Sequence, residues 1–213
     1  KLSTVTVYRE SPMTAEDVLA TDIKHVVVAT GSSWRANGLG RSSAVPIASY
    51  SDARTLTPDD IMAGKRPAGP VVIFDDDHYY MASVIALMLA REGHAVKFVT
   101  SHGVVSSWSE RTAEQAQVQT AIIDAGVAIL ASKTVAGLSP GVADLACVYT
   151  GKLTAIPCGG FIPVSSRSPR DSLWHELHKQ PTLQVHRIGD CKAPGLIAHA
   201  VYDGHRFARE FGE

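Results

Sequence analysis

The middle of the chain alternates between short apolar runs and amphipathic segments in an order that few folds accept. Val71–Phe74 and Val127–Leu130 are continuous apolar runs of strand length, and Val96-Lys-Phe-Val99 is a third run of strand length. Between these runs, apolar residues follow helical spacing, first around Met81–Leu89 and then from about Thr112 to Ala125. The order strand, helix, strand, helix, strand is typical of a parallel sheet with helices on its faces. We therefore predict an α/β fold with a Rossmann-like, doubly wound parallel sheet.

The turn after the first of these strands departs from the nucleotide-binding form of the fold. That form carries G-x-G-x-x-G here, because glycines let backbone amides approach a pyrophosphate at a helix N-terminus. This chain has Asp75-Asp-Asp-His-Tyr-Tyr-Met81 instead. A carboxylate about 4 Å from a phosphate costs about 4 kcal/mol at an effective dielectric constant of about 20. We predict that the phosphate loop is degenerate and that this domain does not bind NADH or NADPH.

Two other uses of the same segment are disfavoured. The run Asp75–His78 has the residue types of a cation site, but consecutive residues project in different directions. The aromatic pair Tyr79 and Tyr80, with Met81, is expected to pack in the core or at a domain interface rather than against a cofactor.

Breaks in the chain indicate a discontinuous organisation. The stretch Lys65–Pro70 is rich in proline and glycine and marks a domain boundary. We predict a Rossmann-like domain of the NAD(P) type over residues 65–159. Residues 1–64 and 160–213 are expected to form parts of one other domain.

The outer segments contain strand patterns of their own. Leu2–Val7 alternates like a strand, and His25–Gly31 reads as a buried strand that ends at a glycine. Short elements cannot bury an apolar face alone. Residues 1–54 and about 165–213 are therefore expected to pack together.

Composition excludes several classes of protein. The 20 basic and 21 acidic side chains leave a net charge of −1 over 213 residues, which argues against a general nucleic-acid binder. No apolar run approaches the ~20 residues of a membrane span. Three cysteines without C-x-x-C spacing are typical of reduced thiols, so we expect a soluble protein of the cytoplasm. The chain begins at Lys1 without an initiator methionine or a signal-peptide pattern, and we expect it to be part of something longer.

Motifs of autonomous catalysis are absent from the sequence. There is no G-x-S-x-G, no G-x-x-x-x-G-K-[ST] and no H-E-x-x-H. His175-Glu-Leu-His178 comes closest to the last, but its histidines are three residues apart and lack a third ligand. We expect neither a catalytic residue nor a metal ligand in this chain.

Several motifs together resemble the flavoprotein disulfide-reductase superfamily. Val26–Gly31 is similar to the A-T-G strand of its FAD-binding domain, and Ile188–Asp190 is similar to the G-D motif of that domain. An NAD(P)H-binding domain lies between these motifs in the superfamily. Phe161–Pro169 resembles its second motif, with Ser166 where glycine is usual.

Further motifs narrow the resemblance to the C-terminal region of the trimethylamine, dimethylamine and histamine dehydrogenase family. They are Leu56–Met62, the tyrosine-rich turn that ends at Met81, and Gly189-Asp-Cys-Lys-Ala-Pro194 followed by Gly204-His-Arg206. The resemblance covers nearly the whole chain. It implies that residues 1–64 and 160–213 are part of an FAD/ADP-binding-type domain.

The resemblance also implies what a longer protein would do. In that family a β/α barrel carries FMN, a 4Fe-4S cluster and the amine site, a nucleotide domain holds ADP (or FAD), and the protein is a homodimer. The reaction is oxidative N-demethylation or deamination of a small amine, with electrons passed to an electron-transferring flavoprotein. This chain alone would hold none of these cofactors and would be inactive.

Four residues are singled out for this chain. Gly31 ends a central strand where the backbone must pass close to a nucleotide or another loop, and Gly189 with Asp190 precedes a helix whose N-terminus could face an anion or ribose. These three are the predicted cofactor-binding residues. Trp108 follows the strand that ends at Val99, at the sheet edge where such domains place functional groups, and is the predicted partner-docking residue.

Two other functions stay open. One is a fragment of an NAD(P)H-dependent flavin oxidoreductase of the dienoyl-CoA reductase type, which the missing G-x-G-x-x-G disfavours. The other is a non-catalytic module that docks a redox partner.

Overall fold

The chain divides into two compact units, one of them discontinuous. The computed structural model describes residues 4–49 and 54–211. Unit 1 comprises Lys1–Ser33 with Ser168–Glu213, and unit 2 comprises Trp34–Arg167. Unit 2 is therefore inserted into unit 1 along the sequence.

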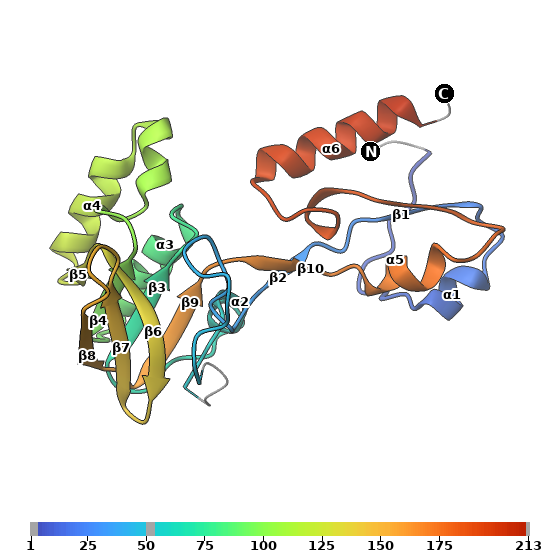
Figure 1. Ribbon diagram of the computed structural model, residues 1–213. Helices are drawn as coiled ribbons and strands as arrows, with labels where there is room; N and C mark the ends of the chain where they lie inside the picture. The colour runs from blue at the N-terminus through green and yellow to red at the C-terminus, as the bar shows by residue number, and fades with distance from the viewer. Residues whose placement is uncertain (1–3, 50–53, 212–213) are drawn as a thin grey trace. The chain divides into compact units, whose positions relative to one another are not determined.

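Unit 2 is built on a parallel sheet with the strand order β5-β4-β3-β9 (Figure 1). Its strands are β3 (Val71–Asp75), β4 (Val96–Thr100), β5 (Ala128–Leu130) and β9 (Gly160–Val164). Every residue of β3 and β9 is buried, as continuous apolar runs in a parallel sheet predict. This sheet confirms the predicted Rossmann-like α/β class.

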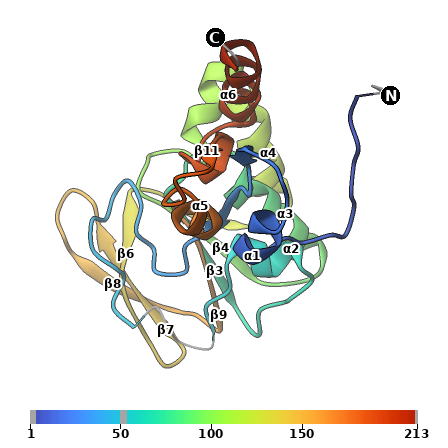
Figure 2. The same cartoon turned by 90° about the vertical axis from the view of Figure 1, so that its right-hand side faces the viewer.

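Helices cover one face of the parallel sheet and a second sheet covers the other (Figure 2). The helical layer contains α2 (Pro58–Met62), α3 (Met81–Arg91) and α4 (Gln115–Asp124). The second sheet is antiparallel and consists of β6 (Lys133–Ser139), β7 (Val142–Cys147) and β8 (Leu153–Pro157). Alternate residues of β3 serve the two layers, since Ile73 packs with the helices and Phe74 with the second sheet.

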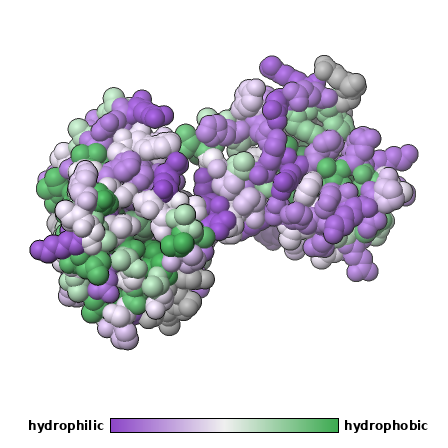
Figure 3. Space-filling view, viewed as in Figure 1, coloured by the Kyte–Doolittle hydropathy of each residue, from purple (hydrophilic) through white to green (hydrophobic). Residues whose placement is uncertain are grey.

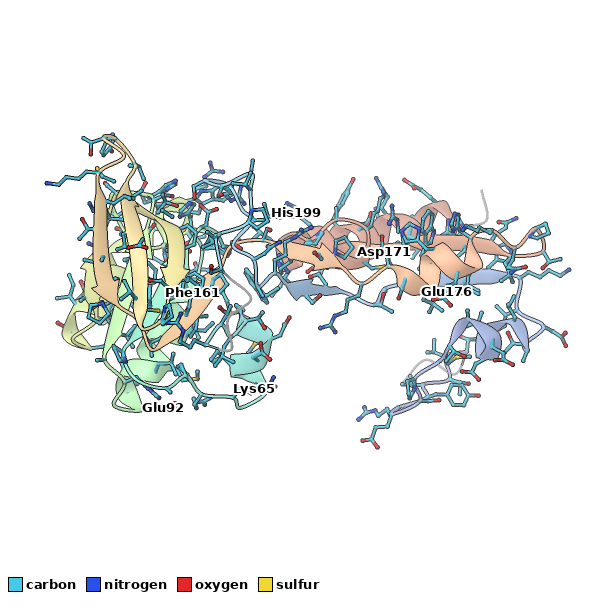
Figure 4. All side chains as sticks on the ribbon, turned by 60° about the horizontal axis from the view of Figure 1, so that its bottom comes forward. Lys65, Glu92, Phe161, Asp171, Glu176 and His199 are labelled. Carbon is cyan, nitrogen blue, oxygen red and sulfur yellow. The ribbon has the colours of Figure 1, made fainter. Side chains whose placement is uncertain are left out.

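Unit 1 pairs β1 (His25–Val28) in parallel with β11 (Gln184–Arg187). Around this pair lie α1 (Ala15–Leu19), α5 (Ser172–Leu177) and α6 (Ile197–Glu210). Asp171, labelled in Figure 4, precedes α5 and accepts a hydrogen bond of 2.5 Å from Arg187. Hydrophilic residues dominate the face of unit 1 that Figure 3 shows, and no residue of α6 is buried.

The boundaries of the units differ from the predicted ranges. Residues 34–64 and 160–167 were expected in the discontinuous domain, but they belong to unit 2. The physical reason is strand pairing: β9 lies in register against β3, and Leu56 donates its backbone N–H to the carbonyl of Phe161, a β9 residue labelled in Figure 4. Whether unit 1 is of the FAD/ADP-binding type stays a prediction.

Two predicted elements are also different in detail. Residues 4–7 form no strand and Val7 is exposed, while residues 1–3 lie outside the described part of the chain. The helix expected over about Thr112–Ala125 is α4, which begins at Gln115 rather than near Thr112 and ends before Gly126. A separate 3-10 helix, η1 (Ser107–Thr112), precedes it. Of the helices in the described residues, none has the length and apolar character that crossing a membrane requires.

Candidate functional site

The acidic turn, Asp75–His78, leads from the carboxyl end of β3 toward α3. This is the place where the dinucleotide-binding form of the fold holds a pyrophosphate. His78 adopts a left-handed backbone with φ of 62°, a conformation that non-glycine residues adopt only at a cost. Asp75 and Asp76 are fully buried and His78 nearly so. Such burial of ionisable groups is unusual and marks the turn as a site.

The backbone amides of the acidic turn donate within the protein. The N–H groups of Asp76 and Asp77 both donate to the carbonyl of Val164 on β9, at 2.8 and 3.0 Å. The N–H group of His78 donates to Oδ1 of Asp75 at 2.9 Å. These amides are the kind of donor that a pyrophosphate uses in this fold. Here they are committed to the protein itself.

The Asp76 carboxylate binds a loop of the same unit. The backbone N–H of Ser42 donates to both carboxylate oxygens, at 2.9 and 3.1 Å, and the Ser42 hydroxyl donates to Oδ1 at 2.6 Å. Burial alone would raise the pKa of Asp76, but hydrogen bonds from His78 and Ser42 outweigh it and lower that pKa. Asp76 is therefore a buried carboxylate that fixes the Gly40–Ser42 loop against the acidic turn.

The pKa of Asp75 is shifted in the opposite direction from that of Asp76. Burial raises the pKa of its carboxyl group to about 7, because the nearby His78 and the backbone hydrogen bonds offset only part of the desolvation. Its Oδ2 atom has no hydrogen-bond partner. The third carboxyl group, that of Asp77, also has its pKa raised by burial, against the influence of Arg167 and Arg41.

A second histidine completes the cluster. His102 follows β4 and stacks on His78, with ring centroids 3.7 Å apart and an interplanar angle of 13°. Nδ1 of His102 lies 2.5 Å from the Ser107 hydroxyl. Desolvation and the neighbouring His78 lower the pKa of His102.

The predicted docking residue lies beside this cluster. Trp108 is on η1 rather than in an irregular loop, and it is partly exposed. The guanidinium carbons of Arg41 and Arg111 lie 4.3 and 5.0 Å from its ring centroid. Its backbone N–H donates to the carbonyl of His78 at 3.0 Å. The structure thus brings Trp108 and the acidic turn into direct contact.

The three predicted cofactor-binding residues all lie in unit 1. Gly31 has φ of 76° and no heavy atom within 4 Å of the position that a Cβ would take. Gly189 opens η2 (Gly189–Cys191), has φ of 61° and donates its N–H to Asp203 at 2.9 Å. Asp190 accepts hydrogen bonds from the Ser32 hydroxyl at 3.0 Å and from the Gly195 N–H at 2.9 Å. These contacts join Ser32, which follows Gly31, and Gly195 to the Asp190 carboxylate, so Asp190 positions the backbone around it.

Sequence reasoning did not find Ser42, Arg41 or His102. His102 has a recognisable signal, because it follows a predicted parallel strand and so belongs at the same sheet edge as the acidic turn. Arg41 and Ser42 have no such signal, since their loop reaches the site through contacts across 34 or more residues of sequence. In the described part of the chain no three His, Cys, Asp or Glu side chains gather in a way that could hold a metal ion.

This chain is similar to a known domain family and to an amine dehydrogenase. Residues 56–180 match the family described as the OYE-like second alpha/beta domain. The chain is 32% identical to dimethylamine dehydrogenase of Hyphomicrobium sp. (strain x), over 95% of this chain and 31% of that protein.

Two solved structures resemble this chain over nearly its full length. One is 6-hydroxypseudooxynicotine amine oxidase from Pseudomonas geniculata N1, with a TM-score of 0.94, 35% identity, and coverage of 98% of this chain and 32% of that chain. The other is histamine dehydrogenase from Rhizobium sp. 4-9, with a TM-score of 0.91, 40% identity, and coverage of 96% of this chain and 33% of that chain. The chain spans about a third of the length of each of these relatives.

Proposed function

Because this chain belongs to the C-terminal region of the trimethylamine dehydrogenase family, we propose that it is the nucleotide-domain region of a flavin-dependent amine dehydrogenase. The relatives described above are named as amine dehydrogenases or as an amine oxidase. Each is about three times as long as this chain. The oxidation of a small amine would belong to the remaining length of such a protein. This chain would act as a non-catalytic part of it.

The observation that supports a non-catalytic role is that the backbone amides and the Asp76 carboxylate of the acidic turn are already paired within the protein. Its amides donate to Val164 and to Asp75, and its Asp76 carboxylate holds Ser42. A pyrophosphate at this position would have to displace these hydrogen bonds and approach buried carboxyl groups. The dienoyl-CoA reductase alternative needs NADPH at this position, so the same geometry disfavours it.

We expect no saturable binding of NADPH to the chain. A titration that follows nicotinamide fluorescence should give a linear response up to hundreds of micromolar, with an NADPH-dependent reductase as the positive control. Saturable binding at micromolar concentration would contradict the proposal. On the longer protein, addition of a small amine should bleach the flavin absorbance whereas NADPH should leave it unchanged.

Cofactors of the longer protein are part of the proposal. FMN and the 4Fe-4S cluster would lie outside this chain, in the β/α barrel that the family resemblance implies. Gly31, Gly189 and Asp190 would border an ADP or FAD site. The open space at the Gly31 Cα fits a backbone that a ligand approaches, whereas the hydrogen bonds of Asp190 fit a positioning role.

We also propose that Trp108 anchors the electron-transferring flavoprotein. Large, partly exposed aromatic side chains are favoured anchors because they offer much contact area for little conformational entropy. The guanidinium groups of Arg41 and Arg111 already contact the indole ring, so less of its freedom is lost on docking.

The substitution Trp108→Ala should slow electron transfer to that flavoprotein by about tenfold, the effect of losing roughly 1.4 kcal/mol at an interface anchor. Reduction of the flavin by amine should stay nearly unchanged. Trp174→Ala is the matched control, because Trp174 is also partly buried and also has an arginine, Arg187, over its ring at 4.2 Å. Equal rates of electron transfer in the wild type and in Trp108→Ala would show that Trp108 only packs within its own domain and does not dock the flavoprotein.

A further inference from the structure

Two buried polar atoms of the acidic turn face each other without a hydrogen-bond partner. They are Oδ2 of Asp75 and Nδ1 of His78, which lie 3.9 Å apart. The Asp75 side chain is 0% exposed and the His78 side chain 1%, so bulk solvent reaches neither atom. Buried polar atoms in native proteins nearly always have a partner, which is either a protein group or an ordered water. Two such atoms side by side therefore indicate a small polar ligand between them.

The protein groups around Asp75 do not supply that partner. Oδ1 of Asp75 accepts the backbone N–H of His78 at 2.9 Å. The backbone N–H of Ser106 lies near the carboxyl group and acts to lower its pKa, but no hydrogen bond reaches Oδ2. The Ser106 hydroxyl is already paired with the hydroxyl of Ser83.

The other nitrogen of the His78 ring has its own neighbours. Nε2 lies 3.5 Å from Oδ1 of Asp76 and 3.4 Å from the Ser101 hydroxyl. A hydrogen bond from the His78 ring helps to lower the pKa of Asp76, which assigns the ring proton to Nε2. In the neutral ring Nδ1 is then an acceptor, and the stacked ring of His102 covers a face of the imidazole rather than this nitrogen.

The separation of the two atoms fits a bridging water. A distance of 3.9 Å is too long for a direct hydrogen bond, but one water oxygen can lie about 2.8 Å from both atoms. Such a water donates one hydrogen to Nδ1 of His78. It accepts a hydrogen bond from Oδ2 of Asp75 if that carboxyl group is protonated and donates its second hydrogen if it is ionised. A metal ion is a poorer fit, since no three suitable side chains gather within the described part of the chain.

We propose that the acidic turn holds one buried, ordered water molecule that bridges Oδ2 of Asp75 and Nδ1 of His78. The water extends a row of polar contacts that runs from Asp75 through the His78 ring to Asp76, which holds Ser42. The end of β3 and the Gly40–Ser42 loop are thereby joined through the site. Globular proteins hold about one buried water for every 27 residues, so a water here is ordinary in kind. The proposal does not rest on the proposed function.

A crystal structure of the complete chain, at a resolution that shows ordered water, tests the proposal. We expect one density peak within about 2.6–3.2 Å of both Oδ2 of Asp75 and Nδ1 of His78. Its displacement parameter should match those of the two side chains. Two outcomes would overturn the proposal. One is the lack of a peak, with the two side chains either apart or in direct contact; the other is a peak at metal-ligand distances below about 2.5 Å.

Two variants test whether Asp75 holds the water. Asp75→Leu replaces the carboxyl group with methyl groups, so the peak should be lost, and relaxation dispersion of solvent 17O should show one long-lived water fewer than in the wild type. Asp77→Asn is the matched control in the same turn, because the side chain of Asp77 is not one of the unpaired buried groups, and it should keep the water. A peak that persists in Asp75→Leu would assign the water to other groups and refute the bridge. If Asp75→Leu does not fold, the density of the wild type decides alone.

Discussion

Replacing Asp75 with asparagine is expected to stabilise the chain by about 2–4 kcal/mol near pH 8. Burial raises the pKa of this carboxyl from 3.8 to about 7, so the folded chain holds the proton more tightly than the unfolded chain. The stabilisation from that proton is complete below the unfolded pKa and is lost as the pH rises through the folded pKa. A difference of about three pKa units corresponds to about 4 kcal/mol. Asparagine stays neutral at every pH, and its amide can also donate toward Nδ1 of His78.

Urea unfolding at several pH values between about 5 and 8 tests this expectation. His102 adds an opposite dependence, because its lowered pKa makes stability fall as the pH drops through 6.5. The difference between wild type and Asp75→Asn isolates Asp75 from that effect. Asp76→Asn is the control of opposite sign, since it weakens the bonds to Ser42 and should destabilise the chain. A wild-type chain as stable as Asp75→Asn at pH 8 would show that burial does not raise the pKa of Asp75.

The sequence predicted the central sheet well because its signals are local. The run at Val71 is apolar over the length of a strand and the run at Val96 nearly so, and Gly93 and Gly126 follow the two helices of the unit with positive φ. The degenerate phosphate loop was also readable, since glycine is required there for a steric reason and Asp75–His78 contains none.

The domain boundaries were not readable in the same way. They depend on which strand pairs with β3, and the register of Val71 with Gly160 joins residues that are 89 positions apart. The alternation at Leu2–Val7 predicts a strand only if another strand lies beside it, and the described residues 4–7 pair with none. Strand pairing between residues so far apart in the sequence cannot be predicted from a local stretch of residues.

The protonation of the aspartates in the site could not be predicted from the sequence either, because it also depends on distant contacts. Three consecutive aspartates look alike in the sequence, yet Asp76 is an ionised hydrogen-bond acceptor and Asp75 is a buried acid with its pKa near 7. The difference arises from the hydrogen bonds that Asp76 accepts from His78 and from Ser42, which reaches it from a distant loop. Without that contact the sequence could predict the loss of a phosphate site but not what replaced it.

That contact also makes Gly40 the glycine in this site that tolerates substitution least. A Cβ at Gly40 would lie 2.1 Å from Oδ2 of Asp76 and 3.0 Å from Cβ of Ser165. Asp76 cannot yield as an exposed side chain would, because it is buried and its oxygens are fixed by Ser42. Any displacement lengthens hydrogen bonds to an ionised buried group.

We therefore expect Gly40→Ala to destabilise the chain by roughly 2–4 kcal/mol in urea unfolding near neutral pH. Gly103→Ala is the matched control, because Gly103 is also a loop glycine without a positive φ but has no heavy atom within 4 Å of its Cβ position. Its effect should stay within about 0.5 kcal/mol of wild type. In the double variant Gly40→Ala with Asp76→Ala, the penalty of the added methyl group should largely vanish, since the clashing carboxylate is gone. A Gly40→Ala chain as stable as Gly103→Ala would mean that the loop moves freely away from Asp76, and that the carboxylate does not fix it.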